Sequence, residues 1–340
     1  MNRYPLLRTM VATTLLLFSQ LSMAIEVSSS NKVLLEKKEN SSASAIEHLK
    51  NMQSAYSQKN YEILYLSSLQ QQLEPMQLIH GNIDAKEVSY FRYLNGVIRE
   101  SLQYSGKISY FEQGKPAYTL RSHHNRSVFA NIAHFDYEHG KQSYDYVILG
   151  KGRIAGKQSI AIRMISKDEY RYSYVIWCDL ESALPLRLDT LSQSNVVLEQ
   201  IMVVSLNVSD EINPWLAKLT QNRLPEIVHI PESATDNSSK WKTTWLPIGF
   251  KVIKDDQHKL MMQENTPVSY ILLDDGLTNV SIYISSKQLA LDEKQKLIRR
   301  GATVLYTEQR GEIEINIVGD IPVATAKRLV ESIVLVSDDN

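Results

Sequence analysis

Short runs of alternating apolar and polar residues recur between residues 62 and 208, and they constrain the fold more than any other feature of the sequence. Successive side chains of a strand point to opposite faces, so residues of one parity share a face. Leu184, Leu186 and Leu188 share one parity, whereas Arg187 has the other. Because Gly, Asn, Asp and Ser separate the runs, the pattern predicts consecutive hairpins in one wide antiparallel sheet.

The predicted strands of this region are Glu62–Leu69, Glu87–Leu94, Val97–Tyr104, Lys107–Glu112, Ala117–Arg121, Tyr144–Leu149, Ser159–Ile165, Tyr170–Asp179, Leu184–Leu191 and Val196–Val208. Two further sets of apolar residues share a face, namely Ile160, Ile162 and Met164, and Met202, Val204 and Leu206. In a curved sheet these faces would line the concave side, as a filled core or as an open lipid pocket.

A helix is predicted just before the strands. Ser41 to Ser44 are suited to cap it, and Ile46, Leu49 and Tyr56 fall at helical spacing over residues 45–58. One helix followed by many meandering strands favours an α+β domain in which a curved sheet wraps about a helix.

The chain begins like a secretory signal peptide. Arg3 and Arg8 precede the apolar run Leu6–Phe18, and Ser22-Met23-Ala24 supplies small residues for cleavage after residue 24. The apolar run is shorter than the roughly 20 residues that span a bilayer. We therefore predict export, with Ile25–Asn40 as a polar lead.

Composition excludes several classes of function. Without residues 1–24, 35 basic and 38 acidic residues remain, a net charge of −3 that offers no basic field for nucleic acid. The single cysteine, Cys178, cannot form an internal disulfide. We interpret it as a small buried apolar residue, since no activating His or Cys lies nearby.

The strand rhythm stops at Ser209. In residues 209–240, a short helix-like piece is followed by Pro225, Pro231 and a polar run, which are typical of a linker. Single cores stop growing near ~250–300 residues, so two domains are expected. The predicted organisation is a signal peptide at 1–24, a domain at 44–208, a linker at 209–240 and a smaller α+β domain at 241–337. The second domain would have strands at Phe250–Ile253, Val268–Leu273, Val280–Ile284, Ala302–Glu308 and Glu312–Val318, and a closing helix at Pro322–Val334.

No residue pattern in the sequence identifies a catalytic site, a cofactor site or a metal site. Gly150 to Ala155 fits the spacing of a dinucleotide loop, but an alternating strand follows where that loop needs a helix, so we interpret it as a hairpin. His134, Asp136, Glu138 and His139 crowd one segment without a recognised metal-ligand spacing. No nucleophile–base pair is evident. We expect a protein that is not an enzyme and that has no cofactor and no metal.

The stretch Arg171–Asp189 resembles the signature strand pair of the RseB/MucB family, and Leu198–Val208 continues the likeness. Ile108–Glu112 agrees upstream, whereas Thr244–Phe250 and Ile317–Leu329 agree in the second domain. The matches follow in order from about residue 45 to 337, which is more specific than any single motif.

The resemblance implies a fold and a function. The first domain would be a lipoprotein-carrier-like, half-open antiparallel β-barrel with helices. The protein would be a periplasmic negative regulator of the sigma-E envelope-stress response, which binds the periplasmic part of an inner-membrane anti-sigma factor and shields it from proteolysis. Lipopolysaccharide or another acyl-chain ligand would release it. Self-association into a homo-oligomer is left open.

Two sets of residues are the candidate binding sites. The apolar lining for lipid is Ile162, Met164, Leu186, Leu188, Met202 and Val204. The aromatic anchors for the partner are Trp245, Leu246, Pro247 and Phe250, which would otherwise seat the core of the second domain. The alternative function is a periplasmic lipid or lipoprotein carrier, which would share the first domain and its apolar face.

Overall fold

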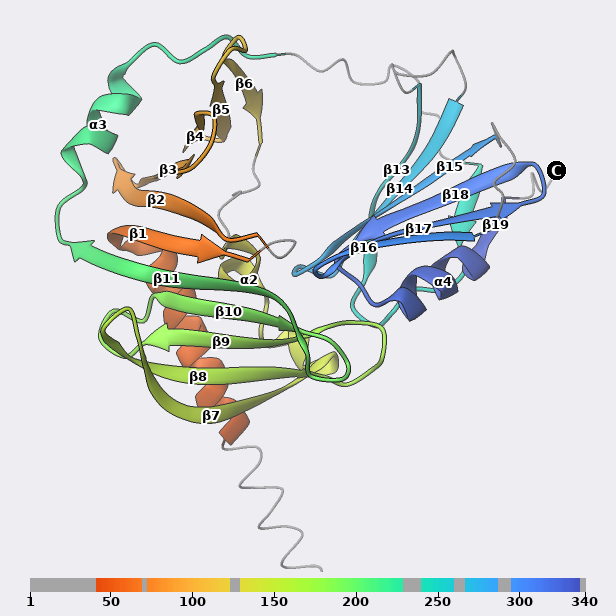
Figure 1. Cartoon of the computed structure of the whole chain (residues 1–340), viewed down its shortest axis with the longest axis horizontal. Helices are drawn as coiled ribbons and strands as arrows, with labels where there is room; N and C mark the ends of the chain where they lie inside the picture. Colours follow the sequence, from red (N-terminus) through yellow and green to blue (C-terminus); the bar gives the residue numbers. More distant parts are fainter. Residues whose placement is uncertain are drawn as a thin grey trace, which may run out of the picture.

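The computed structural model describes residues 41–68, 72–122, 129–228, 240–259, 267–286 and 295–336. The predicted signal peptide and polar lead lie outside these ranges. The described chain forms two domains, an N-terminal one built on eleven strands and a C-terminal one built on six (Figure 1). None of the described helices is long and apolar enough to cross a membrane.

The N-terminal domain is one antiparallel sheet whose strands follow the order β6-β5-β4-β3-β2-β1-β11-β10-β9-β8-β7. Because β1 pairs with β11, the first and last strands meet in the middle, and β6 and β7 are left as edges. The strands are β1 (Asn60–Ser67), β2 (Glu74–Ile83), β3 (Lys86–Tyr93), β4 (Arg99–Tyr104), β5 (Lys107–Glu112), β6 (Tyr118–Arg121), β7 (Tyr144–Ile154), β8 (Lys157–Ser166), β9 (Ser173–Asp179), β10 (Pro185–Leu191) and β11 (Val197–Ser209). The prediction of an α+β fold with a half-open antiparallel sheet is confirmed.

The helix at residues 41–58 fills much of the concave side of this sheet. Leu49, Met52 and Tyr56 on its inner face are buried among apolar side chains of both halves of the sheet. Figure 1 shows the helix crossing behind β7–β11 and β1, whereas β3–β6 curl away beyond its end. Two short helices, α2 (Ala130–His134) and the 3-10 helix η2 (His139–Gln142), follow β6.

Part of the segment that we expected to be a linker belongs to the N-terminal domain. Helix α3 (Pro214–Gln221) begins at Asn213, whose side chain caps the amide of Trp215, and Leu216 is buried against the outer face of β2–β4. Further along, Val228 donates its amide to the carbonyl of Thr119 on β6. These contacts continue the domain at least through Val228, because the outer face of the curled strands needs an apolar cover.

The C-terminal domain packs one helix on a six-stranded sheet of order β13-β14-β15-β18-β17-β16. Helix α4 (Val323–Ser332) buries Ala326, Leu329 and Val330 against it. The strands are β13 (Lys251–Lys259), β14 (Pro267–Asp274), β15 (Asn279–Ser286), β16 (Gln295–Arg300), β17 (Thr303–Arg310) and β18 (Ile313–Gly319), with a separate pair of β12 (Trp241–Thr243) and β19 (Ile333–Leu335).

The glycine-rich segment after residue 149 is the hairpin that the sequence predicted. β7 runs through it to Ile154, and β8 returns after the turn at Ala155 and Gly156. Gly152 is needed for packing, since a Cβ there would lie 2.6 Å from Cζ3 of Trp177. The glycine therefore makes room for an indole ring on the outer face of the sheet.

We predict that Gly152→Ala lowers the free energy of unfolding by about 1–3 kcal/mol, because the added methyl group overpacks against Trp177. Urea unfolding measures this. In a Trp177→Phe background, which removes the clashing part of the ring, the same substitution should cost less. An equal cost in both backgrounds would contradict the packing argument.

Candidate functional site

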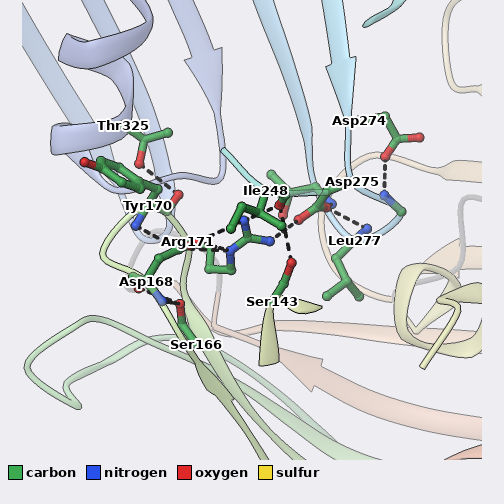
Figure 2. A network of polar contacts seen from close by, with 12 residues as sticks. Ser143, Ser166, Asp168, Tyr170, Arg171, Ile248, Asp274, Asp275, Leu277 and Thr325 are labelled. Carbon is green, nitrogen blue, oxygen red and sulfur yellow. Dashed lines mark hydrogen bonds and ion pairs between the residues drawn. The ribbon is translucent and has the colours of Figure 1, made fainter. Parts of the chain in front are cut away.

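Arg171 lies at the centre of the contact between the two domains, and its side chain is only 3 % exposed. It leaves the loop between β8 and β9, where its Nε donates to both carboxylate oxygens of Asp168 at 3.1 Å. Toward the C-terminal domain, Nη2 donates to the carbonyl of Ile248 and Nη1 lies 3.5 Å from Oδ2 of Asp275 (Figure 2). One guanidinium thus connects three separate segments of chain.

At this junction, hydrogen bonds and opposite charges offset the free-energy cost of burying charged groups. Burial opposes the charge of Arg171, but the hydrogen bonds that it donates to Asp168 and the negative charges around it outweigh that cost and raise its pKa. Burial raises the pKa of Asp275 above its ordinary value. Hydrogen bonds from the amides of Leu277 and Thr278 and the charge of Arg171 offset part of this rise. Each buried charge therefore needs the other, as is usual for buried ion pairs.

The residues beside Arg171 extend the junction on both sides. The carbonyl of Tyr170 accepts a hydrogen bond from Oγ1 of Thr325 at 2.8 Å, so α4 is tied to the same loop (Figure 2). The hydroxyl of Tyr172 lies 2.8 Å from the carbonyl of Ile321 and 3.1 Å from that of Ala302. Three consecutive residues of one loop thus make hydrogen bonds with five residues of the C-terminal domain.

Two further contacts flank this loop. Nδ2 of Asn131, on α2, donates to the carbonyl of Leu277 at 2.8 Å. On the other side, Oε1 of Glu199 accepts the amide of Ala302 at 3.0 Å. The domains are therefore joined by polar contacts as well as by apolar packing.

The predicted partner residues lie in or beside this junction. Trp245 packs edge-on against Tyr170 with ring centroids 4.8 Å apart, and the guanidinium of Arg328 lies 4.3 Å from the ring centroid of Trp245. Phe250 and Pro247 are buried, and Leu246 is partly buried. Phe250 belongs to the apolar core of the C-terminal domain, and Trp245 and Leu246 pack against that core. Trp245 also contacts the N-terminal domain through Tyr170.

Most of the predicted lipid-lining residues form a filled core. Ile162, Met164 and Leu186 have no exposed surface, and Leu188 is 8 % exposed. They pack in one cluster with the inner face of the helix at residues 41–58. An acyl chain can reach them only if that helix moves.

The register of β11 differs at two of the predicted lining positions from the one extrapolated from the sequence. The register pairs Leu188 with Ile201 and Tyr65 with Val203, so Ile201 and Val203 face the core and not Met202 and Val204. A β-bulge opposite Leu64 and Tyr65 inserts one residue, which reverses the parity extrapolated from Leu206. Val204 is accordingly 48 % exposed, while Met202 is partly buried.

An open groove lies on the concave side where the helix no longer covers the sheet. The register continues the core side from Met76 to Tyr93 and from Leu78 to Phe91. Beyond them, Tyr110 and Tyr118 stack with centroids 5.1 Å apart. Phe91, Tyr93, Tyr110 and Tyr118 line a groove of about 290 Å³, at the small end of the roughly 300–1,000 Å³ usual for ligand sites.

The rim of the groove carries charges of both signs. The guanidinium of Arg99 lies 3.7 Å from the ring centroid of Tyr93 and pairs with Glu74 at 3.6 Å. Lys115 stands at the same opening, 3.0 Å from Glu112. This groove was not predicted from the sequence. Its residues lie on strands that were correctly predicted, but the order of those strands in the sheet was not known.

The other candidate sites hold no chemistry of their own. Oδ1 of Asp136 accepts the amides of Glu138 and His139, and Glu138 pairs with Lys50 and Lys141. No group of three His, Cys, Asp or Glu side chains suited to a metal occurs in the part of the chain that the structure describes. Burial raises the pKa of the Cys178 thiol to about 12, which suits a core residue.

Comparison with known proteins places both domains in one family. A sequence profile described as the MucB/RseB N-terminal domain matches residues 44–228, and one described as the MucB/RseB C-terminal domain matches residues 235–334. The sigma-E factor regulatory protein RseB of Escherichia coli (strain K12) is 31% identical over 285 residues, which are 84% of this chain and 89% of that protein.

Two further similarities concern Pseudomonas aeruginosa. Its sigma factor AlgU regulatory protein MucB is 26% identical over 197 residues, which are 56% of this chain and 60% of that protein. The solved MucA/MucB complex structure from that organism contains a similar fold, with a TM-score of 0.70 at 20% identity, over 86% of this chain and 99% of that one.

We predict that Arg171→Met destabilises the protein by about 3–5 kcal/mol, because it leaves the buried carboxylate of Asp275 without its cation. Chemical denaturation measures the loss. Arg171→Met combined with Asp275→Asn should recover part of it, whereas Arg328→Met at the exposed rim should cost less than about 1 kcal/mol. Equal effects at Arg171 and Arg328 would show that the buried pair does not hold the junction.

Proposed function

This chain belongs to the MucB/RseB family, and we propose on that premise that it is a periplasmic negative regulator of the sigma-E envelope-stress response. It would bind the periplasmic part of a membrane anti-sigma factor and shield it from proteolysis. The observation that carries the proposal is the ordered match of both family domains along the chain. The relatives are named as regulators of sigma factors, and a related protein is solved in complex with MucA.

The geometry supports a role in binding rather than in catalysis. At the junction, the buried guanidinium of Arg171 pairs with Asp168 of its own loop and with Asp275 of the C-terminal domain, and so holds the two domains together. This junction would hold surfaces of both domains in a defined arrangement, so that one partner could contact both. We infer that Trp245, Leu246, Pro247 and Phe250 act in partner binding by maintaining this arrangement.

We further propose that a lipid acyl chain is the signal that releases the partner, and that it enters through the groove lined by Phe91, Tyr93, Tyr110 and Tyr118. Each buried methylene would contribute about 0.8 kcal/mol. The cations of Arg99 and Lys115 stand where the phosphate of lipopolysaccharide would remain in water. The deeper apolar residues, Ile162, Met164, Leu186 and Leu188, would admit a chain only after displacement of the helix at residues 41–58. Met202, which is partly buried, would border that path, and Val204 would contribute only from outside it.

A carrier of lipids or lipoproteins is the second candidate, and the open groove is the observation that favours it. A carrier needs the groove but not the C-terminal domain. The ion pair and the hydrogen bonds at Arg171 commit part of the N-terminal domain to holding that second domain. Regulation therefore accounts for more of the structure than transport does.

We expect the chain without residues 1–24 to retain the periplasmic segment of the anti-sigma factor in a pull-down, and to release it when lipopolysaccharide is added. A binding titration at several salt concentrations gives the affinity. Lipid binding without any partner binding would favour the carrier. Partner binding that lipopolysaccharide leaves unchanged would remove the release mechanism but keep the regulator.

We predict that Tyr110→Ala weakens the binding of a fluorescent long-chain fatty acid about fivefold or more, since it removes one wall of the groove. The matched control is Tyr104→Ala, because Tyr104 lies on the neighbouring strand but packs on the outer face. Fluorescence titration of both variants, with thermal unfolding to verify folding, measures the difference. Equal affinities would place the lipid elsewhere.

A further inference from the structure

β16 is the exposed edge of the C-terminal sheet. It pairs with β17 on one side and with no described strand on the other (Figure 1). Each of its six residues, Gln295–Arg300, is exposed. Helix α4 contacts β17 and β18, so the sheet extends past its helix at this edge. An edge of this kind offers backbone donors and acceptors to another chain.

The other described edges of the two large sheets are protected. β6 is four residues long, and its Thr119 exchanges backbone hydrogen bonds with Glu226 and Val228. β7 is interrupted by a register shift at Gly150, and β13 by one between Val252 and Lys254. β16 has no bulge, proline or glycine. It is therefore the described edge best suited to accept an added strand.

The side chains of β16 indicate the chemistry of the added strand. Lys296, Arg299 and Arg300 make it basic without any acidic residue, and Leu297 and Ile298 add apolar surface at exposures of 49% and 40%. An extended segment with acidic residues and intervening apolar ones complements both features, because strand addition takes affinity from the main chain and specificity from side chains.

The N-terminal domain fixes this edge in place. The turn after β16 contains Gly301, at a φ of +57°, and a Cβ there would lie 2.4 Å from Oε1 of Glu199. The same carboxylate accepts the amide of Ala302, and the hydroxyl of Tyr172 reaches the carbonyl of that residue. β16 is therefore continuous with the junction, and a strand bound to it would also approach the N-terminal domain.

We propose that β16 is a strand-addition site for an extended, acidic segment of the anti-sigma partner. The inference rests on the proposed function and names the surface and binding mode that it would use. The basic residues of an edge strand also discourage self-pairing, so the experiment must separate protection of the edge from recognition of a partner.

The test uses the complete exported chain and the periplasmic segment of the anti-sigma factor. Lys296→Glu combined with Arg300→Glu should weaken binding about tenfold or more, because two attractive charges become repulsive. The matched control is Lys251→Glu combined with Lys254→Glu on β13, the opposite edge of the same sheet, which should change affinity less than about twofold. Raised salt should reduce the difference between the wild type and the β16 variant.

Hydrogen exchange distinguishes strand addition from charge attraction alone. In the wild-type complex, the amides of residues 295–300 should gain protection, whereas those of β13 should not. Binding of the wild type and the β16 variant with equal affinity, or binding without this protection, would overturn the inference while leaving the regulator intact. A wild type that binds no partner would instead refute the proposed function. Concentration-dependent dimers with protected β16 would identify a second copy as the occupant and overturn the assignment to the anti-sigma segment.

Discussion

The concave apolar face of an eleven-stranded sheet is the constraint on which the rest of the structure depends. A single helix at residues 41–58 is too narrow to cover so many strands. It fills the space over β7–β11, β1 and β2, and it leaves the inner side of β3–β6 uncovered. The open aromatic groove follows from that difference in width. On the outer side, the same curled strands are covered by α3, which explains why the chain returns to them before it enters the second domain.

The junction obeys a different physical rule. Apolar packing between domains permits sliding, whereas a buried guanidinium with three separate acceptors permits very few geometries. Arg171 contacts Asp168, Asp275 and the carbonyl of Ile248, so a shift of the C-terminal domain would break contacts with two of its segments. Removing any one partner leaves an uncompensated polar group, which makes this arrangement specific even where its net contribution to stability is small.

Strands with one buried and one more exposed face were predicted from the sequence. One strand with both faces buried and one with both faces exposed were missed. In β1 and β15, buried residues alternate with more exposed ones, and both strands were predicted. β2 was missed because Leu78 is buried by the core and Ile79 by α3, which removes the alternation. β16 was missed for the opposite reason, since both of its faces are exposed. Parity failed at Val204 because a bulge depends on the partner strand, which the sequence alone does not identify.

The candidate site was only partly accessible to such reasoning. Arg171 opens the stretch by which the family resemblance was recognised, but nothing in the sequence connects it with Asp275, about a hundred residues later. The groove required knowledge that β3, β4, β5 and β6 are neighbours in that order. Glu74 of the rim pair lies on β2 opposite Ser67 of β1, and Ser67 pairs in turn with Ile201 on β11, two residues from Glu199 at the junction. If lipid lowers the affinity for the partner by some factor, the partner lowers the affinity for lipid by the same factor, since coupling between two sites is reciprocal. Such a regulator responds to lipid only as far as lipid binds more tightly to the partner-free form than to the partner-bound form. The contacts at the junction would therefore have to differ between those two forms.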